Sequence, residues 1–468
     1  MSLQEKLTAA LKEFDMLPRP AMKVVAGVSG GADSVALVHA LTRLEENAPE
    51  IIVCHFNHRL RGRESERDEE FVSRLCEKLD LRFEVSSCDT EAFSKQKKLS
   101  IESAARELRY EFFAEVCEKT GAERIATAHT ADDRAETVLM RMLRGSGTLG
   151  ISSIKPRSDN LIRPLINVSR EEVMEYLADA GEKWVEDSSN DLTIFTRNRV
   201  RKQLLPLLET FNPQMKKALN RLADTAGRQS SYISLQASRI FPQVFTSPGT
   251  KGLLAGSVSE FRAVHRAVRS ELLRTAYATA TGGLERLEFS HLEEMDALLM
   301  SPARSGAVSL PRGAAMEKSY GFFCLVLRCG AADDYKLTVK GEGAKDLPDG
   351  NSAFFEKTSD ISLWERRDVG HFSLEKTGFP IEVRNFRPGD RTVPLGMSGT
   401  KKLKSVFTER KIPSFLRTRL PIFTCKGEII WAGGVVISDS HKAVKGAQNL
   451  RIKLDGLVPD LLETRRGG

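Results

Sequence analysis

The 468-residue sequence contains no Cys-x-x-Cys pair, and no apolar run reaches the roughly 18 residues that a membrane-spanning helix needs. Its seven cysteines are scattered and odd in number, which favours reduced thiols over a disulfide framework. The N-terminal stretch MSLQEKLTAALKEFDML follows an amphipathic helical pattern and lacks the apolar core of a signal peptide. These absences predict a cytoplasmic protein with no membrane partner.

Two common phosphate-binding loops are also missing from the stretch Val24 to Ser34, VVAGVSGGADS. A GxxxxGK[ST] loop needs a lysine, and no lysine lies between Lys23 and Lys78; the dinucleotide pattern GxGxxG is not present in the stretch either. The stretch instead predicts a buried strand, a tight turn at Gly30 and Gly31, and the start of a helix. A helix N-terminus attracts anions, so we expect a phosphate site here, although a glycine turn without a ligand would give the same pattern.

Strands and helices alternate over the first 145 residues, which predicts an α/β fold with a doubly wound parallel sheet. Strands are expected at 24–28, 50–57, 82–86 and 124–127, and helices at 64–79, 100–121, 132–143 and 170–180. Ligands of such sheets lie at the carboxyl ends of the strands, where His55, Asn57 and His129 fall.

The rest of the chain divides into two further parts. Residues 211–335 are expected to be mainly helical, with a β tail at 307–327, and residues 350–468 to form a β-rich α+β domain. The first part then covers residues 1–210, and the segment 331–351, rich in glycine, aspartate and lysine, is the predicted linker.

An imidazole and three carboxylates cluster after the fourth strand, in the stretch His129 to Thr137. Asp132 and Glu136 are four residues apart and share a helix face, with Asp133 beside them. Acids in the first turns of a helix also complement its dipole, which is the alternative explanation. Beside a phosphate loop, the cluster predicts a polar site for an ammonium group or a metal ion.

Basic residues gather in two places, although the net charge of +7 is mild. Arg197 and Arg201 lie in a stretch without acids between Thr193 and Pro206, and a second cluster contains one acid, Glu409. Both suggest contacts with RNA phosphates, although charged runs are often only solvated faces. The second cluster comprises Lys401, Lys402, Lys404, Arg410, Lys411, Arg417 and Arg419.

Several motifs together resemble a known family. SGGADS at 29–34 is similar to the SGGxDS loop of the N-type ATP pyrophosphatases, the PP-loop superfamily. With SIESAARELRYEFF at 100–113, HTADDRAET at 129–137, DSSNDLTIFTRNRVRKQLLP at 187–206 and NFRPGDR at 385–391, the chain resembles the long form of the tRNA(Ile)-lysidine synthetases. The resemblance implies a ligase that adenylates the C2 carbonyl oxygen of the wobble cytidine of tRNA(Ile) with a CAU anticodon. Free L-lysine then displaces AMP, which changes the codon read from AUG to AUA.

The resemblance also implies roles for individual residues and domains. ATP and Mg²⁺ are the expected cofactors: Ser29, Gly30, Gly31, Ala32, Asp33 and Ser34 would hold the pyrophosphate, with His55 beside the nucleotide, and Asp33 would place the metal. Arg106 and His129 would stabilise the α-phosphate and the activated base, and Asp132, Asp133 and Glu136 would hold the lysine ammonium or a metal. Asp33 could instead cap its helix, and Arg106 could pair with Glu102 or Glu107. Residues 211–335 and 350–468 would be tRNA-binding domains, and the expected contacts with the tRNA are Arg197, Arg201, Lys401, Lys402, Lys404, Arg410 and Arg417.

Three other functions compete with this one. A small-molecule ligase of the same superfamily would turn over without RNA, and a tRNA thiolase would be expected to carry paired cysteines, which this chain lacks. A non-catalytic RNA-binding protein would be expected to have a broken loop, whereas SGGADS is intact. The oligomeric state is left open, with a homodimer as one option.

Overall fold

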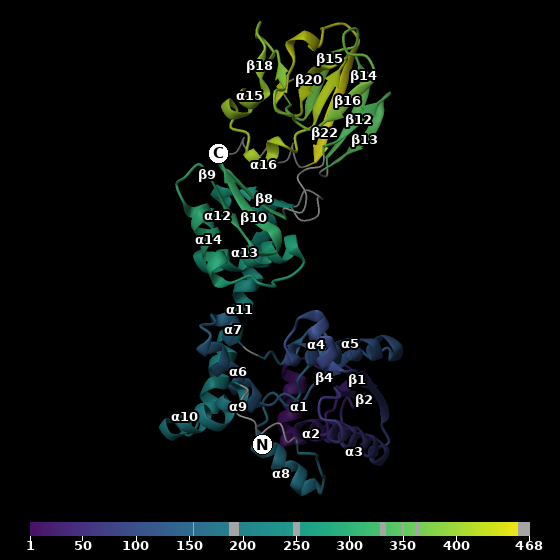
Figure 1. Cartoon of the computed structure of the whole chain (residues 1–468), viewed down its shortest axis with the longest axis vertical. Coiled ribbons are helices and arrows are strands. Elements are labelled where there is room, and N and C mark those ends of the chain that lie inside the picture. Colours follow the sequence, from purple (N-terminus) through teal and green to yellow (C-terminus); the bar gives the residue numbers. More distant parts are fainter. Residues whose placement is uncertain are drawn as a thin grey trace. The chain divides into compact units, whose positions relative to one another are not determined.

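The computed structural model describes residues 1–152, 154–186, 196–246, 253–327, 334–348, 351–361 and 366–456. The chain forms two compact units, Met1–Ser231 and Tyr232–Gly468 (Figure 1). Across the described ranges, no helix is long and apolar enough to cross a membrane. The division into residues 1–210, 211–335 and 350–468 stays a prediction.

The first unit is built on a six-stranded sheet in the order β3-β2-β1-β4-β6-β5. The first five strands in this order are parallel to one another, and only β5, at the edge, pairs antiparallel. This arrangement confirms the predicted doubly wound fold. Strands β5 and β6 were not predicted, because two residues are too few to show a periodicity. The strands are β1 (Lys23–Gly27), β2 (Glu50–Asn57), β3 (Arg82–Ser87), β4 (Arg124–Ala126), β5 (Arg157–Ser158) and β6 (Leu161–Ile162).

Helices cover both faces of this sheet (Figure 1). Successive side chains of a strand point to opposite faces, so Val24 and Ala26 of β1 pack on one side and Val25 on the other. The first side is covered by α1 (Leu3–Glu13), α2 (Ala32–Thr42), α3 (Arg63–Leu79) and α8 (Arg170–Ala180), and the second by α5 (Ile101–Thr120), which follows α4 (Thr90–Lys97).

Capping residues explain which helix ends could be predicted. Ser100 caps α5 by accepting a hydrogen bond from the Ser103 N–H at 3.2 Å, and Gly121 ends the helix at φ 73°. Gly181 likewise ends α8. Helix α3 has no such side-chain cap, because Gly62 precedes it and supplies no side chain.

The remaining helices of the first unit pack on α6 (Ala131–Leu143). A small core joins Ala135, Val138 and Leu139 of α6 to Val200 and Leu205. This core places residues 196–216 beside the acids of α6. The helices are α7 (Thr148–Ile151), α9 (Thr196–Arg199), the π-helix η2 (Val200–Leu204), α10 (Leu205–Phe211) and the start of α11 (Met215–Val244). Met142 and Leu143, at the C-terminal end of α6, lie outside this core and are 46% and 68% exposed.

The second unit contains a sheet that the sequence did not fully predict. Its order is β7-β8-β11-β10-β9, and β8 (Leu253–Ser257) lies in a stretch that was expected to be helical. The other strands are β7 (Phe245–Thr246), β9 (Ser305–Ser309), β10 (Ala314–Ser319) and β11 (Phe322–Leu327), and the helices are α12 (Val258–Ala263), α13 (Arg266–Thr281) and α14 (Phe289–Met300). Helices α13 and α14 pack on one face of this sheet.

The C-terminal part of the second unit is β-rich, as predicted. Its main sheets run β12-β16-β19-β20-β21 and β13-β14-β22-β15. The predicted linker is wrong where it is described, since it contains β12 (Lys336–Val339) and β13 (Gly343–Leu347). The other elements are β14 (Asn351–Thr358), β15 (Val369–Ser373), β16 (Ile381–Arg384), β17 (Arg391–Thr392), β18 (Lys401–Lys402), α15 (Leu403–Glu409), α16 (Ser414–Arg417), β19 (Ile422–Cys425), β20 (Glu428–Ala432), β21 (Val436–Ile437) and β22 (Asn449–Gly456).

Gly27, at the end of β1, is a test of the packing that holds the phosphate loop. A Cβ there would lie 2.5 Å from Cζ of Phe113, which is buried under the sheet. We expect Gly27→Ala to lower the free energy of unfolding by about 1–3 kcal/mol, because the ring must shift in a packed core. Thermal or denaturant unfolding measures this. The matched control is Gly147→Ala, whose Cβ meets nothing within 4 Å; equal stability of the two variants would contradict the expectation.

Candidate functional site

The stretch Ser29 to Ser34 joins the end of β1 to α2 as a tight, internally bonded loop. Gly30 has φ +91°, a conformation that side chains disfavour. The Ser34 hydroxyl donates to the Gly31 carbonyl at 2.8 Å, and the Val185 N–H donates to the Gly30 carbonyl at 2.9 Å. Gly31 precedes α2 and supplies no capping side chain, so the first N–H groups of the helix remain available to an anion.

His55 lies behind this loop. Its Nδ1 is 2.9 Å from the Val28 carbonyl oxygen, and the residue is 5% exposed. Burial lowers the pKa of its imidazole, so the ring is neutral at pH 7. In this structure His55 therefore supports the start of the loop.

Asp33 lies in the first turn of α2 and does not cap the helix. Its Oδ2 accepts a hydrogen bond from Nη1 of Arg170 at 3.1 Å, while Oδ1 is buried and has no hydrogen-bond partner. Burial raises the pKa of Asp33 to about 6, and the carboxylates of Asp133 and Asp132 add to this, against Arg170 and Arg201. The vacant lone pairs of Oδ1 suit a hard cation.

Mg²⁺ at this position would depend on ligands other than protein side chains. Over the described residues, no group of three or more His, Cys, Asp or Glu side chains could hold a metal ion. Mg²⁺ commonly uses one or two carboxylates together with substrate phosphates and water. Asp33 beside a phosphate loop fits that kind of site.

The three acids of α6 lie together, as predicted, but each already has a partner. Oδ2 of Asp132 accepts from the Arg170 backbone N–H at 2.8 Å, and its Oδ1 lies 2.8 Å from Nζ of Lys216. Asp133 forms a capping box with Thr130, whose N–H donates to Oδ2 at 3.0 Å. One oxygen of Asp133 thus serves the start of the helix, as the alternative explanation expected. The other oxygen, Oδ1, faces two arginines, so stabilising the helix is only part of the role of Asp133.

Glu136 is the most deeply buried of these acids, with a side chain that is 1% exposed. Nε of Arg197 lies 2.9 Å from its Oε2, and Nε of Arg201 lies 2.5 Å from its Oε1. The same guanidinium groups reach Oδ1 of Asp133 at 3.4 and 3.5 Å. Arg197 and Arg201, which the sequence assigned to RNA, are therefore ion-paired inside the acid cluster.

His129 and Arg106 are predicted site residues that lie near the arginines Arg109 and Arg163. Nδ1 of His129 is 3.0 Å from the Thr127 hydroxyl, and burial lowers the pKa of the imidazole to about 4, so it is neutral at pH 7. The Arg106 guanidinium lies over the Tyr110 ring at 4.8 Å. Within the described part of the chain it makes no ion pair with Glu102 or Glu107, and Glu107 instead approaches Lys97 at 4.0 Å.

Sequence reasoning missed four cations of this site. Arg170 and Lys216 neutralise Asp33 and Asp132, and Arg109 and Arg163 lie near His129. Arg170 is followed by Glu171 and Glu172, and Lys216 by Lys217, but each of the four cations meets its partner in the site only through the fold. The one local signal is the position of Arg163, directly after an apolar pair that ends β6.

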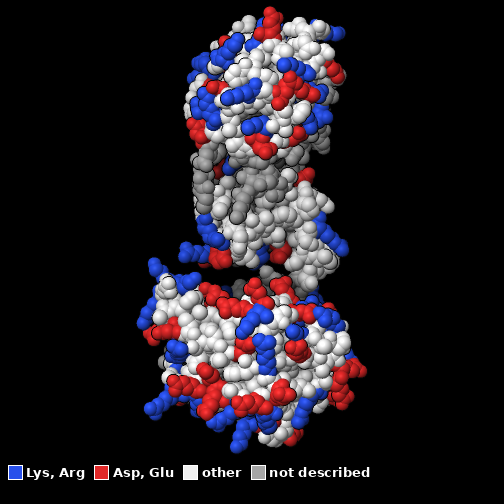
Figure 2. All heavy atoms as spheres, turned by 90° about the vertical axis from the view of Figure 1, so that its right-hand side faces the viewer, with Lys and Arg blue, Asp and Glu red and all other residues white. Residues whose placement is uncertain are grey.

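The predicted RNA contacts of the second unit lie on and beside α15 and α16. Lys402 and Lys404 are exposed, while Lys401 pairs with Glu409 at 2.5 Å. Arg410 donates to the Val435 carbonyl, and Nε of Arg417 donates to the Ile412 carbonyl at 3.0 Å. Figure 2 shows basic and acidic side chains interspersed on the face in view, so charge segregation alone does not mark an RNA surface there.

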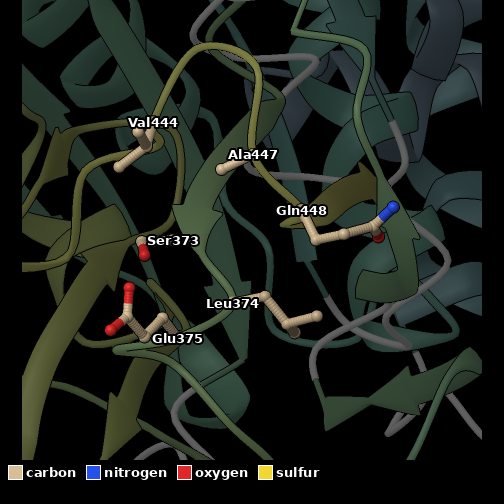
Figure 3. A pocket seen from close by; sticks show the side chains of 6 residues that line it. All are labelled: Ser373, Leu374, Glu375, Val444, Ala447 and Gln448. Carbon is tan, nitrogen blue, oxygen red and sulfur yellow. The ribbon is translucent and has the colours of Figure 1, made fainter.

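A pocket of about 400 Å³ lies elsewhere in the second unit (Figure 3). Its lining carries one carboxylate, Glu375, and no cation, so it does not suit a phosphate. The lining residues are Ser373, Leu374, Glu375, Val444, Ala447 and Gln448.

Comparison with known proteins finds relatives that match nearly the whole chain. Three family models match: the PP-loop domain over residues 1–208, the TilS substrate binding domain over 257–321 and the TilS substrate C-terminal domain over 381–454. The chain is 34% identical to the tRNA(Ile)-lysidine synthase of Geobacter sulfurreducens over 453 residues, which cover 96% of each protein. It is 32% identical to that of Caldanaerobacter subterraneus over 457 residues, again 96% of each. A crystal structure of the TilS C-terminal domain aligns with 27% of this chain and 98% of its own at 28% identity, with a TM-score of 0.25.

The raised pKa of Asp33 predicts a pH-dependent cost to stability. Between its ordinary value of 3.8 and about 6, folded Asp33 holds a proton that the unfolded chain has released, so stability falls as pH rises through this window. Asp33→Asn removes this loss, which is on the order of 3 kcal/mol. In buffer without Mg²⁺ or nucleotide, we expect the melting temperature of the variant to rise relative to that of the parent protein as the pH is raised from 4.5 to 7.5. Asp179→Asn, on an exposed face of α8, is the control; a difference independent of pH would contradict the assignment.

Proposed function

Because the chain belongs to the tRNA(Ile)-lysidine synthase family, a family of ligases, we propose that it joins free L-lysine to C2 of the wobble cytidine of tRNA(Ile) with a CAU anticodon. ATP is consumed, AMP and pyrophosphate are released, and the codon read changes from AUG to AUA. The observation that carries the proposal is the match over 96% of the chain together with an intact loop at the end of β1. A tRNA substrate also agrees with the cytoplasmic location expected from the sequence.

The loop Ser29 to Ser34 supports the nucleotide half of the reaction. Its open glycine backbone and the uncapped start of α2 suit the pyrophosphate, and Oδ1 of Asp33 suits the Mg²⁺ that would accompany it. Bound there, Mg²⁺ would neutralise charge on the phosphates. The C2 carbonyl oxygen attacks the α-phosphate, and pyrophosphate leaves.

His129 and Arg106 support the adenylated intermediate. A neutral imidazole can donate a hydrogen bond without adding charge, and the Arg106 cation, held over Tyr110, attracts the α-phosphate oxygens. Both act where negative charge develops during transfer.

The acid cluster supports the amine half of the reaction. Asp132, Asp133 and Glu136 bind the lysine ammonium, and a carboxylate of this group accepts the proton as the amine attacks C2 and AMP departs. The acids are neutralised by Arg197, Arg201 and Lys216, so lysine must displace part of that network. Arg197 and Arg201 can then both pair with the acids and bind RNA, because once lysine releases them from the acids they are available to RNA phosphates.

Further tRNA contacts are proposed for the second unit. Lys402 and Lys404 project from the start of α15 into solvent, and Lys401, Arg410 and Arg417 flank them. Their side chains can bind the phosphate backbone, which positions an RNA without reading its sequence.

The proposed activity is tested by incubating the protein with ATP, labelled lysine and tRNA(Ile) transcripts that carry C or U at the wobble position. We expect label transfer to the C transcript alone, with AMP and pyrophosphate formed in equal amounts. Transfer to neither transcript, or the formation of ADP and orthophosphate, would refute the proposal.

Glu136→Gln separates the two halves of the reaction. It removes a charged partner of the amine, so we expect the KM for lysine to rise about 10- to 100-fold. RNA-dependent release of pyrophosphate without lysine should stay within about two-fold of the parent rate, because Glu136 contacts Arg197 and Arg201 and not the residues of the phosphate loop. Single-turnover assays measure both steps.

The matched control for this variant is Glu123→Gln, an acid paired with Arg19 on an exposed edge. It should change neither step. An equal loss in both steps of Glu136→Gln, together with a lower melting temperature and an unchanged KM, would show that Glu136 only stabilises the fold.

A further inference from the structure

Arg163 is a buried cation that the proposed reaction does not yet use. It follows β6 directly and is 6% exposed. Its Nη1 donates to the Lys155 carbonyl at 2.5 Å, but its Nε is buried and has no hydrogen-bond partner. A guanidinium group in such a place normally binds an anion.

The charged neighbours of Arg163 add positive charge and do not balance it. Burial and the charge of Arg106 lower the pKa of Arg163, whereas the Tyr110 side chain raises it, and Arg163 and Arg109 both lower the pKa of His129. Nε of Arg109 is likewise buried without a partner. Among the residues that the structure describes, neither Arg109 nor Arg163 forms an ion pair with a carboxylate.

This arrangement contrasts with the acid cluster nearby, where four carboxylates each have a cationic partner. Like charges held together in a buried place repel one another, and removing them from water costs free energy. A fold keeps such a group where a ligand supplies the missing charge.

We propose that Arg163, together with Arg109, forms an anion-binding site for one phosphate group of the reacting substrates, at the carboxyl ends of β4 and β6. Arginine suits this task, because its planar fork donates two parallel hydrogen bonds to phosphate oxygens. The proposal rests on the proposed function and adds a binding residue to it.

Two phosphate groups can reach this place. Strand β4 lies between β1 and β6, so the end of β6 is two strand spacings, about 10 Å, from the phosphate loop. An arginine side chain can span much of that distance toward the α-phosphate of the nucleotide. A phosphodiester beside the target cytidine enters the same edge of the sheet with the base.

Titrations of the full-length protein with two ligands distinguish the sources. AMP carries only the α-phosphate, and the CAU tRNA(Ile) transcript without nucleotide carries only phosphodiesters. We expect Arg163→Gln to weaken one of them by about 10- to 100-fold, as the loss of a charged hydrogen bond does. If the site takes an RNA phosphate, the salt dependence of log Kd also falls by about one unit of slope.

Arg157→Gln is the matched control, since Arg157 lies six residues earlier and already pairs with Asp15. It should leave both affinities unchanged. Arg163→Lys keeps the positive charge but lacks the planar guanidinium group, so it should give an intermediate loss of affinity. This variant replaces Arg163→Gln in the test if that variant does not fold.

Unchanged affinity of the Arg163 variants for both ligands, with parent protein that binds both, would overturn the anion site and leave the proposed function standing. Parent protein that binds neither AMP nor the transcript would instead count against the proposed function. Loss of melting temperature in Arg163→Gln without loss of affinity for either ligand would show a structural role only, and would also overturn the site.

Discussion

The ion pairs of Glu136 constrain the rest of the first unit. A carboxylate that is 1% exposed needs opposite charge to offset its loss of hydration, and here two guanidinium groups, from Arg197 and Arg201, supply it. Both arginines lie in a segment that follows Glu136 by more than 60 residues in the sequence. The apolar contacts of Val200 and Leu205 with α6 hold that segment in place. Once it is there, Lys216 reaches Asp132, so the electrostatics of the acid cluster follow from the packing of one short helical segment.

The site therefore has two poles with different states of charge. At the acid pole the carboxylates are neutralised by the chain itself, whereas at the basic pole Arg109 and Arg163 have buried nitrogens that await a partner. At the proposed sites an anionic ligand would find its partners already in place, whereas an ammonium ligand would have to displace an arginine or a lysine. This asymmetry agrees with the proposed reaction, in which nucleotide and RNA act first and the amine second.

Local patterns predicted the parts of the fold whose causes are local. The ends of α5 and α8 followed from Ser100, Gly121 and Gly181, and the phosphate loop followed from its glycines. The strands β5, β6 and β8 were missed, because their length or setting leaves no clear periodicity. The acids of α6 were found as a cluster, but their partners were not. Ion pairs across 60 residues leave no trace in the sequence, and cations without acidic neighbours along the chain resemble free ones.

The missed strand β8 also changes how the second unit can act on RNA. Its side chains alternate between two cores: Leu254 packs with α13 and α14, while Leu253 and Ala255 pack with the β-rich C-terminal part. The Ser414 N–H of α16 donates to the Ser319 hydroxyl of β10 at 3.2 Å, which joins the same two parts. Two domains on a free linker would each bind RNA with its own affinity. A shared core instead holds the basic residues around α15 and α16 at a fixed place on the sheet, so both parts would contact a tRNA as a single surface.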